Sequence, residues 1–137
     1  MASLDDSDIV DADRLVCITQ KIVEQKAASG HCVIVGRGAP HFLRDREDTF
    51  CVFLYGSRDA KYHRVRTLIK DDTQAINLVD TVDQERADFI MHYFKAQWPS
   101  RQLYDVMLNT DVGEDETVNT ILHLVDSANK RQGADKA

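Results

Sequence analysis

Three short apolar runs alternate with longer helical patterns along this chain, and this alternation limits the possible folds more than any other feature of the sequence. The runs cover residues 32–35 (CVIV), 50–55 (FCVFLY) and 104–108 (YDVML). Short continuous apolar runs are typical of strands that are buried on both faces, as in parallel sheets. The sequence therefore predicts an α/β fold with a parallel sheet, in which all three runs are strands.

Four helical patterns surround these runs and cover residues 11–29, 57–70, 73–97 and 114–130. In the first pattern, apolar residues recur at spacings of three and four and predict one buried face: Leu15, Ile18, Ile22 and Val23. Gly30 stands where a C-terminal cap is expected, and Ser57 can cap the second helix. Asp71 precedes the predicted start of the third.

The composition is that of one ordinary globular domain. Hydrophobic residues make up 43% of the 137 residues and charged residues 29%, and no apolar run approaches the ~18 residues of a membrane span. The acidic N-terminus lacks the layout of a signal peptide. An odd number of cysteines without C-x-x-C spacing indicates buried thiols in a reducing cytoplasm. We expect a single cytoplasmic domain over residues 1–131, no membrane partner, and a disordered tail over 132–137.

A basic segment interrupts an otherwise acidic chain of net charge −6. Residues 31–70 carry eight basic and four acidic side chains, whereas residues 71–128 carry three basic and twelve acidic ones. Arginine suits bidentate contact with phosphate, so the segment is a candidate anion site, although a solvated helix face explains the same composition. The acidic balance argues against general binding of DNA or RNA.

The turn Gly36-Arg37-Gly38 follows the first apolar run. Ligands of open α/β sheets bind beyond the carboxyl ends of the strands, and glycine lets the backbone approach a ligand closely. The alternative is a tight turn with a solvent-facing Arg37. A dinucleotide fingerprint fails because His41 occupies its third glycine position. The sequence contains no G-x-x-x-x-G-K-[ST] phosphate loop, and its histidines lack metal-ligand spacing, so no metal site is predicted.

Four stretches read together resemble the cytidylate-kinase-like family of bacterial P-loop nucleoside-monophosphate kinases. In chain order they are CVIVGRGAPHFLRDR, FCVFLYGSRDAKYHRV, VDQERADFIMHYFKAQW and LYDVMLNT. The resemblance implies a three-layer α/β/α fold around a parallel sheet of strand order 2-3-1-4-5. The family's first strand, phosphate loop and first helix precede the matched region. We therefore expect a truncated fold, with the three predicted strands as the third, fourth and fifth.

The resemblance also implies a substrate-binding turn. Gly36, Arg37 and Gly38 match the turn whose arginine contacts the phosphate of the monophosphate substrate. Lys61 stands where the family has the first arginine of the helix that leads into a mobile lid, and it is included among the substrate-binding residues.

The implied catalytic residues are Arg64, Asp83 and Arg86. Arg64 matches an arginine of the lid-entry helix, and the other two match an Asp-x-x-Arg pair whose arginine meets the phosphates being transferred. The implied activity is phosphorylation of CMP or a related nucleoside monophosphate by ATP. ATP and Mg²⁺ are expected as cofactors only where a phosphate-loop segment completes the chain, so this chain alone is expected to be inactive.

Three functions remain open: a kinase completed by further sequence, a nucleotide- or phosphate-binding module without ATP chemistry, and a structural or assembly domain without a ligand.

Without the family's first strand, runs 32–35 and 50–55 each have an open edge, and unpaired buried backbone groups cost about 1–3 kcal/mol each. The two strands pair directly, the chain is part of something longer, or a second copy supplies a strand. We expect the last of these, a homo-oligomer.

Overall fold

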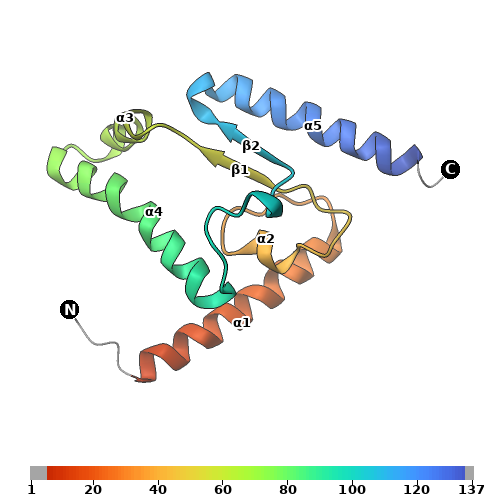
Figure 1. Ribbon diagram of the computed structural model, residues 1–137, viewed down its shortest axis with the longest axis horizontal. Helices are drawn as coiled ribbons and strands as arrows, with labels where there is room; N and C mark the ends of the chain where they lie inside the picture. The colour runs from red at the N-terminus through yellow and green to blue at the C-terminus, as the bar shows by residue number, and fades with distance from the viewer. Residues whose placement is uncertain (1–5, 135–137) are drawn as a thin grey trace. The chain divides into compact units, whose positions relative to one another are not determined.

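The computed structural model describes the backbone of residues 6–134 and the side chains of residues 11–134. The elements follow in the order α1 (Asp6–Ser29), α2 (Ala39–Phe42), β1 (Val52–Tyr55), α3 (Arg58–Leu68), α4 (Asp72–Phe94), η1 (Arg101–Leu103), β2 (Val106–Asn109), η2 (Thr110–Val112) and α5 (Glu114–Ala134), as Figure 1 shows. They belong to two compact units, residues 1–49 and 50–137, and each unit is described by itself. None of the helices within residues 6–134 combines the length and the apolar character needed to cross a membrane.

The first unit is built around α1. Gly30 follows the last residue of the helix with a φ of 71°, which confirms the predicted cap. The core contains Val23, Ala39 and Leu43, each at most 5% exposed, with Ala27, Ile34 and Phe42 packed against it. The rest of the predicted apolar face is at least 52% exposed: Leu15, Ile18 and Ile22. Among the described side chains of α1, only those of its C-terminal part contribute to this core, through Val23 and Ala27. The predicted burial of the thiols is wrong for Cys17 and Cys32, which are both exposed.

The predicted strand at residues 32–35 is wrong, because the backbone there is neither strand nor helix. Val33 and Val35 are 91% and 84% exposed, while Ile34 packs against the core of the unit. A strand is held by hydrogen bonds to a neighbouring strand. Within residues 6–134 no strand pairs with this run, so its apolar composition alone does not make it part of a sheet.

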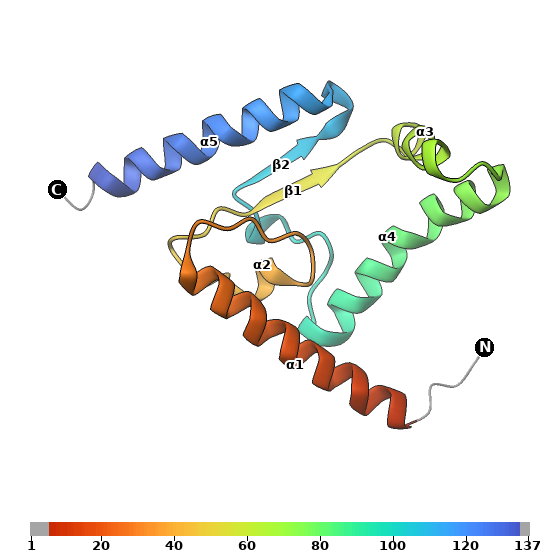
Figure 2. The ribbon, with the colours of Figure 1, turned by 180° about the vertical axis from the view of Figure 1, so that it is seen from behind.

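The second unit contains a parallel sheet of two strands, β1 and β2, in which Val52 lies opposite Val106 and Tyr55 opposite Asn109 (Figures 1 and 2). This confirms the α/β class with a parallel sheet. The two runs that the resemblance makes the fourth and fifth strands are indeed neighbours. The connection between them includes α3, α4 and η1, since parallel strands require a crossover of this kind.

Burial of β1 differs from the prediction at its carboxyl end. Phe53 packs against the rings of Trp98 and Tyr104, at centroid distances of 5.4 and 5.0 Å. Leu54 and Tyr55 are instead 49% and 45% exposed. Within the described part of the unit, the predicted burial of both faces of this strand is therefore wrong at these two residues.

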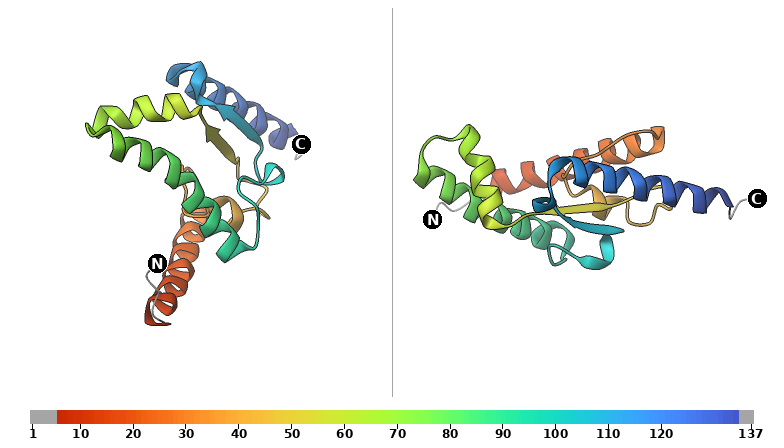
Figure 3. Two further views of the ribbon diagram at one scale, coloured as in Figure 1. Left: turned by 60° about the vertical axis from the view of Figure 1, so that its left-hand side comes forward. Right: turned by 90° about the horizontal axis from the view of Figure 1, so that it is seen from above.

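Local hydrogen bonds explain where α3 and α4 begin and end; Figure 3 shows the two helices joined by a short link. The Ser57 hydroxyl accepts the Ala60 N–H at 3.2 Å, which confirms the predicted cap of α3. The Asp71 carboxylate accepts the Gln74 N–H at 2.8 Å and caps α4. Helix α4 ends earlier than predicted, because Lys95 adopts a left-handed conformation with a φ of 52°.

Helix α5 begins with three acidic residues in its first turn, where the helix dipole favours negative charge. It continues to Ala134 and so includes the first residues of the predicted tail. The rest of that predicted tail, residues 135–137, lies outside the described part of the chain.

Candidate functional site

The turn Gly36-Arg37-Gly38 lies in the first unit, directly before α2. All three residues have a left-handed backbone, with φ of 70°, 60° and 70°, and the N–H of Ala39 donates to the carbonyl of Gly36 at 3.1 Å. Glycine adopts this conformation freely, whereas a residue with a Cβ loses about 1–2 kcal/mol there. Such strain is typical of functional positions. Arg37 is exposed, and no hydrogen bond or ion pair within residues 11–134 holds its guanidinium.

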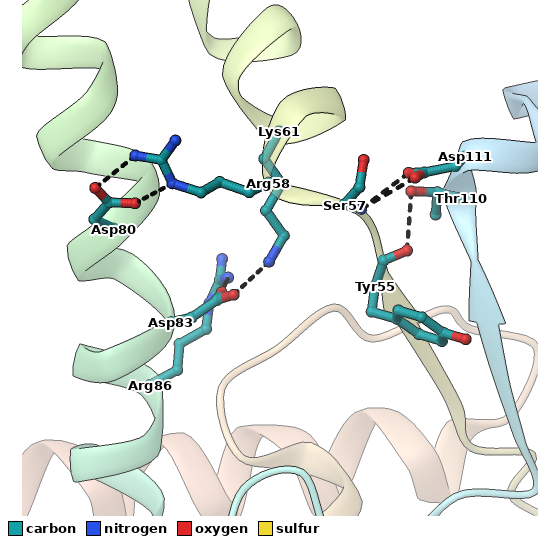
Figure 4. Close-up of polar contacts among 9 residues, drawn as sticks. All are labelled: Tyr55, Ser57, Arg58, Lys61, Asp80, Asp83, Arg86, Thr110 and Asp111. Carbon is teal, nitrogen blue, oxygen red and sulfur yellow. Dashed lines mark hydrogen bonds and ion pairs between the residues drawn. The ribbon is translucent and has the colours of Figure 1, made fainter.

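In the second unit, basic residues of α3 pair with carboxylates of α4 (Figure 4). Nε and Nη2 of Arg58 donate to the two oxygens of Asp80, both at 2.8 Å. One turn further along each helix, Lys61 donates to Oδ2 of Asp83, and Nη1 of Arg86 donates to Oδ1 of the same carboxylate at 3.0 Å. The structure thus brings two of the predicted site residues, Lys61 and Arg86, to the carboxylate of a third, Asp83.

The surrounding charges keep both carboxylates ionised. Partial burial alone would raise the pKa of Asp83, but the hydrogen bonds and charges of Lys61 and Arg86 outweigh it and lower the pKa below its usual value. The hydrogen bond from Arg58 likewise lowers the pKa of Asp80. At neutral pH the α3–α4 cluster, which we define as Arg58, Lys61, Asp80, Asp83 and Arg86, therefore contains three cations and two anions.

Arg64 lies one turn beyond Lys61 on α3 and is exposed. Its guanidinium makes no hydrogen bond or ion pair within the described part of the chain. The pKa of Asp111 is lowered mainly by hydrogen bonds from Ser57 and to a smaller extent by the charge of Arg64. Arg64 therefore presents its donors to solvent beside a cluster that already carries excess positive charge.

Two aspartates accept backbone N–H groups at the two ends of the sheet. The sequence predicted no role for either of them. Both oxygens of Asp111 accept the Ser57 N–H, at 3.1 and 3.2 Å, where β1 leads into α3 (Figure 4). At the other end, Oδ2 of Asp105 accepts the Cys51 N–H at 2.6 Å. Asp105 and Asp111 are six residues apart, and so are the residues whose N–H groups they accept, Cys51 and Ser57. In both cases the six-residue spacing spans one apolar run of the sheet. This equal spacing is the sequence signal that could have identified the two aspartates.

The described residues supply cations rather than metal ligands. Among them, no group of three or more His, Cys, Asp or Glu side chains is arranged to hold a metal ion. The exposed Arg37 belongs to the first unit, and the α3–α4 cluster with Arg64 belongs to the second. What both can do chemically is bind anions, through charge-assisted hydrogen bonds from guanidinium and ammonium groups.

A family model described as the cytidylate kinase-like family matches residues 1–112. The chain belongs to the cytidylate kinase-like family. The match confirms the resemblance seen in the sequence, and it includes the Gly36-Arg37-Gly38 turn, the α3–α4 cluster and Asp111. All of α5 lies beyond it.

The fold of this cytidylate kinase-like chain is similar to the crystal structure of an uncharacterized protein from Eubacterium ventriosum. The two are 26% identical, with a TM-score of 0.71, and the similarity covers 85% of this chain and 65% of the other. The chain thus spans less than two thirds of that protein's length. No curated protein matches the chain.

Proposed function

We propose that this chain binds CMP or a related nucleoside monophosphate, and that Arg37 holds the phosphate. The observation that carries the proposal is the strained turn: an exposed arginine sits between two left-handed glycines, with no partner for its guanidinium in the described residues. Arginine is suited to bidentate contact with a phosphate. Membership of the cytidylate kinase-like family makes the phosphate of a nucleotide the best candidate for that contact.

In the same proposal, Arg64 and Arg86 contact the phosphates being transferred, and Asp83 holds Arg86 as long as no phosphate is bound. Supporting this, Asp83 holds Arg86 by a hydrogen bond of 3.0 Å, while Arg64 is exposed one turn beyond Lys61. Cations at such positions offset the charge that spreads over the phosphoryl oxygens during transfer.

The described residues supply no phosphate loop for ATP. The 137 residues contain no phosphate-loop motif, and the described side chains include no group of three or more His, Cys, Asp or Glu residues that could hold a metal ion. We therefore assign no catalytic step to this chain alone. As part of the proposal, β1 and β2 are the last two strands of a three-layer P-loop kinase-like sheet, which their parallel pairing supports.

Calorimetry with CMP and with cytidine tests the proposed function. The two ligands differ only in the phosphate, and hydrogen bonds to a charged group contribute about 1.5–3 kcal/mol. We expect CMP to bind at least about tenfold more tightly than cytidine. Equal affinities, or no heat from CMP at millimolar concentration, would contradict the proposal and favour a domain without a nucleotide ligand.

Self-association is a second expectation, and it follows from the edges of the sheet. In the described residues, β1 pairs only with β2, so each strand keeps one edge without a backbone partner. Open edges are templates for pairing with another chain. We propose a homo-oligomer and expect sedimentation equilibrium at micromolar concentration to give a mass of at least two chains. A folded monomer at that concentration would rule it out.

A further inference from the structure

We infer that Asp83 is a built-in counter-ion: it occupies the anion position between Lys61 and Arg86, and a phosphate group that enters this position displaces it. The inference rests on the proposed function, because the site is the one assigned to the phosphates. It adds that the carboxylate of Asp83 competes with the phosphate and thereby lowers the affinity for it.

The geometry distinguishes Asp83 from the neighbouring acid of the α3–α4 cluster. Asp80 forms a closed pair, because its two oxygens bind two nitrogens of the same guanidinium, that of Arg58. Asp83 instead bridges two helices: one oxygen binds Lys61 of α3 and the other binds Arg86 of α4 (Figure 4). Two cations that converge from different helices on one small anion form a site, whereas a single bidentate pair does not.

The donors around Asp83 exceed what one carboxylate can use. A guanidinium carries five N–H groups, yet a single hydrogen bond to Asp83, from Nη1, engages the head group of Arg86 in the described residues. The side chain of Arg86 is 59% exposed, and those of Lys61 and Asp83 are 32% and 38% exposed, so solvent and small anions reach the site. The local charge is +1 before Arg64 is counted.

A phosphate group is a better partner for these donors than a carboxylate. It offers three oxygens and up to two negative charges, so it can bind the Lys61 ammonium and the Arg86 guanidinium together. Asp83 and phosphate cannot occupy the same position. Binding therefore includes the loss of the Asp83 contacts, and the apparent affinity for phosphate is lowered by what those contacts contribute.

The test is a titration with inorganic phosphate at neutral pH and constant ionic strength, followed by the amide NMR signals of α3 and α4. An exposed ion pair contributes about 0.2–1 kcal/mol, so we expect Asp83→Asn to bind phosphate roughly 1.5- to 5-fold more tightly than the wild type. Asp83→Ser is a second neutral variant and should show the same gain. Circular dichroism establishes that each variant is folded.

Asp88→Asn is the matched control. Asp88 lies on the same helix, and among the described residues it accepts a hydrogen bond only from Gln84, at 2.8 Å, so this variant removes one negative charge without releasing a cation. Its phosphate affinity should stay within experimental error of the wild type. Weaker binding in both Asp83 variants, an equal gain in Asp88→Asn, or no phosphate binding at α3 and α4 in any variant would overturn the inference. The result is independent of cytidine and CMP, so failure of the proposed nucleotide site is distinguished from failure of the counter-ion.

Discussion

Arg37→Ala is expected to lower the affinity for CMP by a factor of about 10 to 150. This range corresponds to the 1.5–3 kcal/mol that hydrogen bonds to a charged group contribute. The side chain has no other partner in the described residues, so its removal leaves no unpaired group behind. Calorimetry measures the change directly. Arg44→Ala is the matched control, because Arg44 is an exposed arginine nearby that pairs with Asp45 at 3.7 Å, and this variant should bind CMP like the wild type.

Arg37→Gly separates the role of the side chain from that of the backbone. We expect the same loss of affinity as in Arg37→Ala. The free energy of unfolding should be about 0.5–1 kcal/mol higher than that of Arg37→Ala, because glycine adopts a φ of 60° without the strain of about 1–2 kcal/mol but loses about 0.5–1 kcal/mol more in conformational entropy on folding. Urea denaturation followed by circular dichroism measures the difference. If Arg37→Gly keeps the affinity, or is no more stable than the alanine variant, the strained arginine is not maintained for phosphate binding.

Local sequence patterns predicted the elements whose ends are fixed by nearby residues. Ser57 caps α3, Asp71 caps α4 and Gly30 ends α1, and each of these signals acts over only a few residues. Residues 32–35 show where such reasoning fails. An apolar run becomes a strand only when a neighbouring strand offers hydrogen bonds, and the run itself carries no information about whether that neighbour exists.

The candidate site likewise includes residues that local sequence patterns could identify and pairings that they could not. The Gly36-Arg37-Gly38 turn and the spacing of Asp83 and Arg86 could be recognised from the sequence, because both lie within single short segments. The pairing of Lys61 with Asp83 depends on how α3 lies against α4, and no local pattern gives that register. The roles of Asp105 and Asp111 depend on the register of β1 against β2, which puts each aspartate beside a backbone N–H 54 residues earlier in the chain.

Asp111→Ala is expected to lower the free energy of unfolding of the second unit. Its carboxylate accepts the N–H of Ser57, the residue that caps α3, and the variant removes this acceptor from the start of the helix. For a unit of this size, each kcal/mol lowers the melting temperature by about 4–8 °C. Thermal and urea denaturation measure both quantities. Asp111→Asn keeps one acceptor oxygen and should lose less stability than Asp111→Ala.

Asp126→Ala is the charge-matched control for this prediction. Asp126 is an exposed acid of α5 without a hydrogen bond or ion pair in the described residues, so its removal should change stability by less than about 0.5 kcal/mol. Hydrogen exchange then locates the effect. In Asp111→Ala the amides of the first turn of α3 should exchange faster, because the carboxylate that joins this turn to the end of β2 is gone. If the same amides remain as protected as in the wild type, Asp111 does not hold α3 in place, and the position of Lys61 and Arg64 depends on the α3–α4 ion pairs alone.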